Sequence, residues 1–339
     1  MEFFLEYAGF LLRVLTVVVA LAVVAALMAG ARMRGKDGQG SLQVRSLNEF
    51  YQELKDSLQE QLLDKKQLKE LRKQDKAKAR ADKEQSGQPR VFVLDFDGDI
   101  KASATAGLRH EITAVLALAT AQDEVVVRLE SGGGMVHSYG LAASQLARIR
   151  EAGIPLTVCV DKVAASGGYM MACIGNKILS APFAVLGSVG VVAQVPNIHK
   201  LLKKNDIDVE VLTAGEYKRT LTILGENTRE GREKFLQDLQ TTHDLFKEFV
   251  SRYRPQLDMQ KVATGEVWLG TRAFDLQLVD SLQTSDAYLA ERAKNARLFA
   301  LDFSHKKTLP ERFGMASAQA ADSFLIRWWE KLVAGQFWR

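Results

Sequence analysis

The amino-acid sequence predicts an α/β domain that is preceded by an amino-terminal transmembrane helix. Three observations indicate this fold class. From Val91 onward, short apolar segments alternate with helical patterns, as they do in α/β proteins. Several of these short segments are apolar throughout, which is typical of strands in a sheet that is covered on both faces. Near the amino terminus, Val14 to Ala31 contains no charged residue and has transmembrane length.

The bulk composition is that of an ordinary globular protein. Of the 339 residues, 47% are hydrophobic and 25% are charged, which suits one large domain or two smaller ones. The net charge is only +4, so the chain as a whole shows no sign of binding nucleic acid. Cys159 and Cys173 lie in or beside apolar segments without metal-site spacing, and we expect two buried free thiols. No pattern indicates a cofactor or a metal ion.

Residues 1–31 are interpreted as an uncleaved membrane anchor. A cleaved signal peptide is the alternative, but its apolar region is usually shorter and follows a basic start. Here Glu2 and Glu6 make the start acidic. Lys and Arg residues follow the anchor and favour a cytoplasmic body, yet long domains can be translocated regardless of such charges. The sequence therefore leaves the membrane side of the body open.

Residues 32–90 are expected to form a linker with an amphipathic, Lys-rich helix. Ser46 and Glu49 have the spacing of a capping box, and leucines follow at steps of three and four. The segment then becomes rich in lysine up to about Lys83. Two interpretations stay open: a stalk or oligomer contact that also touches anionic lipid, and a solvated spacer.

The body, residues 91–300, is predicted to alternate between strands and helices. Strands are expected at 91–96, 125–129, 156–160, 177–181, 189–194 and 209–214. Helices are expected at 108–118, from the glycine turn at 132–134 through 150, from about 166, and at about 228–253. The apolar segment 184–195 is too short for a second membrane span, so a buried strand is the better interpretation.

Residues 301–339 form a carboxy-terminal tail that is rich in aromatic side chains. We expect it to pack on a neighbouring subunit or at the membrane interface, with docking onto the chain's own body as the alternative. The aromatic residues of this tail are Phe324, Trp328, Trp329, Phe337 and Trp338.

The first of three segments with catalytic potential is the glycine turn Glu130 to Gly134, which follows a predicted strand. Its glycines let backbone N–H groups approach a ligand closely. A nucleotide-phosphate loop is excluded because no Gly-Lys-Ser/Thr follows. An oxyanion hole and a plain tight turn remain.

The second segment, Ala164 to Met170, places Ser166 at the start of a predicted helix. A hydroxyl at that position lies near the positive end of the helix dipole, and the glycines after it leave room for a substrate. The alternative is that Ser166 merely caps the helix. The segment also lacks the G-x-S-x-G pattern of α/β-hydrolases.

The third segment, Gly215 to Thr220, contains Lys218. A lysine amine has a pKa of about 10.4 in water and is then a poor base at neutral pH. Burial beside apolar walls and another cation favours the neutral amine, and Arg219 is adjacent in the sequence. The alternative is an ordinary surface lysine.

Together these segments resemble the signal peptide peptidase A family of serine proteases. The resemblance covers residues 91–282, and for the inner-membrane members it extends over the anchor and the linker. Four matches in the same order make it specific, although each alone is weak. They are A-S-G-G-Y at 165–169, G-S-V-G-V at 187–191, G-E-Y-K at 215–218, and the segment 264–282, which fits V-[WF]-x-G-x-x-A-x-x-x-x-L-V-D.

The resemblance implies a ClpP/crotonase-like fold of repeated β-β-α units and a Ser/Lys dyad. It assigns Ser166 as the nucleophile, Lys218 as the general base and Ser188 as the residue that orients the lysine. It assigns the N–H groups of Gly133 and Gly167 to the oxyanion hole.

One departure concerns the glycine turn. The family usually has S-P-G-G where this chain has Ser131 to Gly134, so glycine replaces proline and the turn is expected to be less rigid.

The resemblance also implies peptide or protein substrates, such as remnants of signal peptides or membrane proteins. It implies a ring-like homo-oligomer in the inner membrane of a bacterium, with lipid contact through the anchor.

Three alternatives to this function remain. The first is a Ser-His-Asp triad, for which His137 is the most tempting base, although Val191 occupies the position at which ClpP carries its histidine. The second is a crotonase-like enzyme for acyl-thioesters, and the third a non-catalytic membrane scaffold that binds peptides.

Overall fold

The computed structural model describes residues 40–64, 66–71 and 88–304. One compact unit, residues 42–303, holds almost all of the described elements. The predicted anchor, most of the Lys-rich segment and the aromatic tail lie outside the described residues. Within the part described, no helix combines the length and apolar character that a membrane crossing requires.

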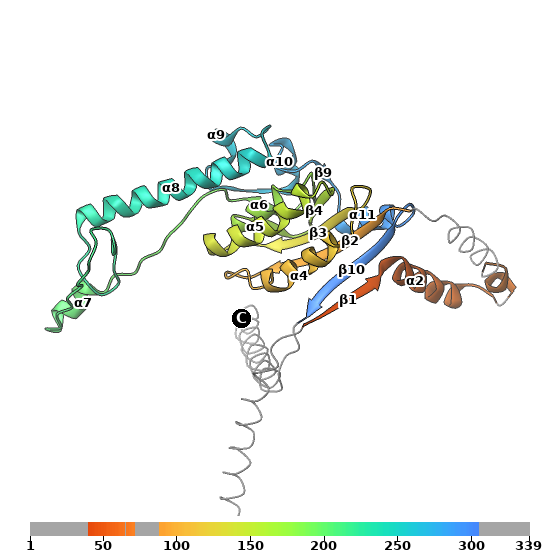
Figure 1. Cartoon of the computed structure of the whole chain (residues 1–339), viewed down its shortest axis with the longest axis horizontal. Coiled ribbons are helices and arrows are strands. Elements are labelled where there is room, and N and C mark those ends of the chain that lie inside the picture. Colours follow the sequence, from red (N-terminus) through yellow and green to blue (C-terminus); the bar gives the residue numbers. More distant parts are fainter. Residues whose placement is uncertain (1–39, 65, 72–87, 305–339) are drawn as a thin grey trace, which may run out of the picture. The chain divides into compact units, whose positions relative to one another are not determined.

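The unit is built on a mostly parallel sheet, which confirms the predicted α/β class (Figure 1). The neighbours β10, β2, β3, β4, β6 and β9 pair in parallel in that order. In order across the sheet, the strands are β1 (Ser41–Ser46), β10 (Arg297–Ser304), β2 (Arg90–Gly98), β3 (Glu124–Ser131), β4 (Leu156–Val160), β6 (Lys177–Ser180) and β9 (Ser281–Leu282).

A small branch leaves the sheet at the carboxyl end of β3. There β5 (Val163–Ala165) pairs in parallel with β3 and with β7 (Val185–Gly187). In turn, β7 pairs antiparallel with β8 (Val267–Leu269). The chain passes from β4 to β5 and then directly into helix α6 (Gly167–Ala172), which makes one β-β-α unit.

Alternation along the strands gives the sheet two apolar faces. On β2, Phe92, Leu94 and Phe96 belong to the larger core, whereas Val91 and Val93 belong to a smaller cluster. Side chains of α4 (Thr105–Leu116), α5 (Val136–Glu151), α6 and α8 (Arg229–Tyr253) enter the larger core. Side chains of α2 (Leu47–Leu62) and α11 (Ser285–Arg292) enter the smaller cluster. The short helices are α7 (His199–Lys204), α9 (Met259–Val262) and α10 (Gly270–Asp275).

Several sequence predictions are confirmed in detail. The side chain of Ser46 caps α2 by accepting a hydrogen bond from the Glu49 N–H group (3.3 Å). Both cysteines are buried and free. Burial raises the pKa of Cys159 to about 12 and raises that of Cys173 as well, so both thiols stay protonated at neutral pH.

Two predicted strands are wrong. The segment 189–194 lies beyond the end of β7, because consecutive positive φ angles at Gly187 (97°) and Ser188 (50°) turn the chain out of the sheet. Val192 is consequently 85% exposed. The segment 209–214 is also exposed, and it pairs with no strand in the described part of the chain. Apolar alternation there did not produce a strand, because a strand needs a partner for its backbone groups.

Glu111 is a buried carboxyl group, and it predicts a pH-dependent stability. The residue is 5% exposed, and its Oε1 atom accepts the Phe303 N–H group (2.8 Å). Among the described residues, no group hydrogen-bonds to Oε2. Burial raises the pKa of Glu111 from 4.5 to about 7. The folded state therefore binds this proton more tightly than the unfolded state does, and stability falls as the pH rises from 4.5 to 7.

We expect Glu111→Gln to remove that dependence, because the amide stays neutral at every pH. At pH 8 the variant should be more stable than the wild type by about 3 kcal/mol, and at pH 5 this difference should shrink to less than about 1 kcal/mol. Urea unfolding at both pH values measures this difference. Glu151→Gln at an exposed site is the matched control and should show no such change. A wild-type stability that is equal at both pH values would contradict the assignment.

Candidate active site

Ser166 lies at a strained junction between β5 and α6. Its backbone has φ 53° and ψ −119°, an unfavourable conformation for a residue with a side chain, which costs about 1–3 kcal/mol. The junction is held on both sides: the Ser166 N–H group donates to the Gly187 carbonyl (2.8 Å), and the Ser166 carbonyl accepts the Met170 N–H group (3.0 Å). Within the described residues, the hydroxyl makes no helix-capping hydrogen bond. The interpretation of Ser166 as a simple cap is therefore not supported.

Close packing beneath Ser166 explains the two glycines that follow it. A Cβ atom on Gly167 would lie 2.4 Å from Cγ of Tyr139, and one on Gly168 would lie 2.4 Å from the Ser131 carbonyl oxygen. Any side chain at either position would push α6 away from β3 and α5. The result is a sharp strand–turn–helix that presents the serine hydroxyl, although the G-x-S-x-G pattern is missing.

The glycine turn lies directly against the serine. Gly133 has φ 87°, and a Cβ atom there would lie 2.8 Å from Cβ of Ser166 and 2.7 Å from N of Gly167. Only glycine fits this approach. The structure therefore brings together Ser166 and the two predicted oxyanion residues, Gly133 and Gly167.

A buried hydroxyl network anchors the glycine turn, and sequence reasoning missed it. The Ser131 hydroxyl accepts the Gly133 N–H group (3.1 Å) and pairs with the Tyr139 hydroxyl (2.5 Å). The Tyr139 hydroxyl also lies 2.7 Å from the Asp99 carbonyl oxygen, to which it can donate. Tyr139 is fully buried on the core side of α5. A tyrosine on the apolar face of a predicted helix was the available signal, since a buried hydroxyl needs a partner.

Ser188 lies next to Ser166 because of strand register. In the parallel pair β5–β7, Ala165 is opposite Gly187, and the Ser166 N–H group donates to the Gly187 carbonyl, so the backbones of Ser166 and Ser188 lie close together. The Ser188 N–H group donates to the Glu266 carbonyl (2.6 Å). The structure thus joins Ser188 to the group formed by Ser166, Gly133 and Gly167.

A narrow apolar pocket opens beside Ser166. Val136 from α5, Met170 from α6 and Phe246 from α8 contribute to its walls. Val191 lies in this pocket, at the position where the triad alternative needed a histidine. His137 is exposed at the start of α5, and His243 directs its Nε2 atom to the Val189 carbonyl (3.2 Å). Neither histidine is among the residues that line the pocket within the described chain.

Lys218 does not occupy the buried site that the sequence analysis expected. The residue is exposed, and its segment packs against the first turns of α8. The Lys234 ammonium lies 5.5 Å from the Tyr217 ring centre, and a Cβ atom on Gly231 would lie 2.2 Å from the Thr220 carbonyl oxygen. Thr242, which lines the pocket beside Ser166, lies farther along α8 than Lys234. At the helical rise of about 1.5 Å per residue, the two positions are about 12 Å apart along the helix axis. A single chain therefore leaves Lys218 apart from Ser166.

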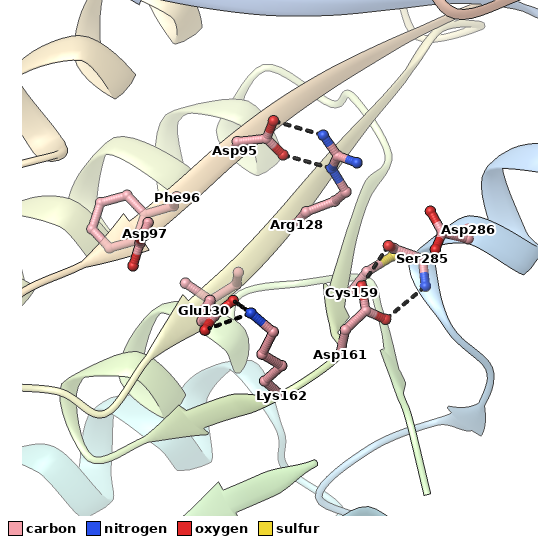
Figure 2. A pocket seen from close by; sticks show the side chains of 11 residues that line it. Asp95, Phe96, Asp97, Arg128, Glu130, Cys159, Asp161, Lys162, Ser285 and Asp286 are labelled. Atoms are coloured by element: carbon pink, nitrogen blue, oxygen red, sulfur yellow. Dashed lines mark hydrogen bonds and ion pairs between the residues drawn. The ribbon is translucent and has the colours of Figure 1, made fainter. Parts of the chain in front are cut away.

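A second, larger pocket on the opposite face of the sheet is charged (Figure 2). It has a volume of ≈ 350 Å³, and most of its charged groups pair with one another. Arg128 pairs with Asp95, and Lys162 pairs with Glu130 (Figure 2). The described residues contain no group of three or more side chains suited to hold a metal ion. Burial raises the pKa of its thiol, Cys159, so the thiol stays protonated at neutral pH and is a poor nucleophile.

Comparisons with known proteins give a consistent result. Residues 2–146 match the model of the peptidase family S49 N-terminal region, and residues 148–298 match the model of peptidase family S49. A probable protease SohB of Haemophilus influenzae is 48% identical over 335 residues, which cover 95% of each chain. A probable protease SohB of Buchnera aphidicola is 45% identical over 305 residues, covering 86% of this chain and 100% of the relative. Protease 4 of Haemophilus influenzae is 26% identical over 160 residues, which cover 47% of this chain and 26% of the relative.

Proposed function

From the premise that this chain belongs to peptidase family S49 and is a serine peptidase, we propose that Ser166 is its nucleophile and Lys218 its general base. The observation that carries the proposal is the strained Ser166 between Gly133 and Ser188. A costly backbone conformation persists where the surrounding structure holds it, and such residues cluster at active sites.

The chemistry is acyl transfer to serine. The Lys218 amine takes the proton of the Ser166 hydroxyl while Oγ attacks the peptide carbonyl. The N–H groups of Gly133 and Gly167 stabilise the negative charge on the carbonyl oxygen. The lysine then gives its proton to the leaving amine, and water hydrolyses the acyl-enzyme. The Gly133 N–H group has to share or exchange its bond to Ser131 Oγ when the oxyanion forms.

The lysine that serves each Ser166 comes from a neighbouring copy of the chain. Two observations support this extension of the dyad. The segment around Lys218 packs on the first turns of α8, apart from Ser166 of the same chain. The segment 192–224 also carries exposed apolar side chains, as a surface between copies does. They include Val192, Leu201, Leu212 and Ile223. A ring-like homo-oligomer would place such a segment over the next subunit.

Mixed oligomers test both the dyad and its arrangement. Ser166→Ala and Lys218→Ala chains are each expected to be inactive alone. Co-expressed in equal amounts, they should recover about a quarter of wild-type peptide hydrolysis, because that share of sites receives an intact serine and an intact lysine. Fluorogenic peptide turnover by the purified mixture measures the recovery. A mixture that stays inactive would place both residues of the dyad in one chain, and full activity of either single variant would exclude that residue from the dyad.

We propose further that the chain is a bacterial inner-membrane endopeptidase. The uncharged stretch from Val14 to Ala31 supports an anchor in contact with lipid, and apolar peptides from signal sequences or membrane proteins suit an apolar pocket. The β4–β5–α6 unit supports the ClpP/crotonase-like arrangement. Family membership favours this function over an acyl-thioester enzyme or a scaffold.

A further inference from the structure

The turn that carries Ser188 is strained and needs support from outside. Gly187 and Ser188 both have positive φ angles, and Ser188 adopts its angle of 50° despite its side chain. Such a conformation persists only where neighbouring groups hold it. On one side, the Ser188 N–H group donates to the Glu266 carbonyl before β8 (2.6 Å). On the other side, α8 provides the support.

His243 is the group that α8 directs to this turn. Its Nε2 atom lies 3.2 Å from the carbonyl oxygen of Val189, the residue after Ser188. A carbonyl oxygen only accepts hydrogen bonds, so Nε2 carries the proton and donates. Val189 is completely buried, which limits how far its peptide group can move once the hydrogen bond forms.

The neighbours of His243 on α8 also touch the active site. Thr242 and Phe246 line the pocket beside Ser166, together with Gly190 at the end of the turn. Phe246 is buried, so this part of α8 is anchored in the core. Because this helix is anchored, its hydrogen bond to the Val189 carbonyl restricts the movement of the turn that carries Ser188.

We propose that His243 is a positioning residue, which holds the Ser188 turn in the geometry that receives the catalytic lysine. This inference rests on the proposed Ser166/Lys218 chemistry. His243 does not touch the reacting atoms. It acts through the Val189 peptide, and a displaced Ser188 would misalign the lysine amine against Ser166.

Three substitutions separate positioning from simple packing. His243→Ala removes the ring, His243→Phe keeps a flat ring without a donor, and His243→Gln keeps an amide N–H at a similar reach. We expect the Ala and Phe variants to lower kcat by about 10- to 100-fold while KM changes little, as misplacement of a catalytic group does. The Gln variant should recover most of kcat. Leu245→Ala, at an exposed site on the same helix, is the control and should behave like the wild type.

The experiment uses the full-length chain in mild detergent, with a fluorogenic peptide and thermal melting. A packing role predicts that Phe rescues and Gln does not, so wild-type kcat in His243→Phe would overturn the proposal. Loss of kcat in His243→Gln equal to that in His243→Ala would also overturn it. Full activity of Ser166→Ala would refute both the proposed function and the proposed role of His243. If Ser166→Ala is inactive but the His243 variants are fully active, only the proposed role of His243 is refuted.

Discussion

Ser166→Ala is expected to abolish peptide hydrolysis while the fold remains intact. Loss of the nucleophile should lower kcat by about 10⁴-fold or more, because the acyl-enzyme forms on the Ser166 oxygen. Stability should change by less than about 0.5 kcal/mol. The reason is that the Ser166 hydroxyl makes no capping hydrogen bond within the described residues, and alanine meets the same backbone strain as serine.

Turnover of a fluorogenic peptide and covalent labelling by a fluorophosphonate measure this effect. Wild-type protein should carry the label on Ser166, and the variant should carry none. Ser144→Ala is the matched control, since Ser144 is exposed on α5 and its hydroxyl donates to the Gly140 carbonyl of the same helix (2.8 Å). Peptide hydrolysis that persists in purified Ser166→Ala at the wild-type rate would exclude Ser166 as the nucleophile.

The largest loss of stability is expected from Arg254→Met. Arg254 ends α8 and is 4% exposed. Its guanidinium forms two hydrogen bonds to the Asp280 carboxylate (2.8 Å each) and one to the Gln277 carbonyl (2.9 Å). Asp280 in turn accepts the Ile178 N–H group of β6 (2.7 Å). This one side chain therefore ties the end of α8 to the edge of the sheet.

Methionine fills most of the space of Arg254 but leaves Asp280 without its countercharge. Breaking a buried ion pair costs about 3–5 kcal/mol, and we expect about 3 kcal/mol here because Asp280 is 32% exposed and regains some water. Urea unfolding of the full chain measures the loss. Arg272→Met breaks the exposed pair with Asp275 and should cost less than about 1 kcal/mol. Equal losses in the two variants would show that burial of the Arg254 pair is irrelevant.

Local patterns were sufficient for many elements of the fold. The capping box at Ser46, the apolar strands that precede the glycine turn and the long amphipathic helix each depend on neighbours in sequence. The two wrong strands depend on something else. Segments 189–194 and 209–214 have suitable composition, but whether a strand forms is decided by a partner edge elsewhere in the chain.

In the candidate site, too, the residue types could be predicted from local motifs, but their arrangement could not. Ser166, Lys218, Ser188, Gly133 and Gly167 were predicted from motifs, and their roles remain proposals. The structure brings four of them together through the register of β5 with β7 and the close approach of the glycine turn. The structure leaves Lys218 apart from these four residues, against the first turns of α8.

By itself, the sequence determined the α/β class, the family and the residues able to do chemistry, because motifs and periodicity are properties of neighbouring residues. Only the tertiary structure decided the strain at Ser166 and Ser188, the Ser131–Tyr139 network beneath the glycine turn, and the contact of His243 with Val189. Each of these joins segments that are distant in the chain. Their geometry is set by strand register and helix packing, which no single segment contains.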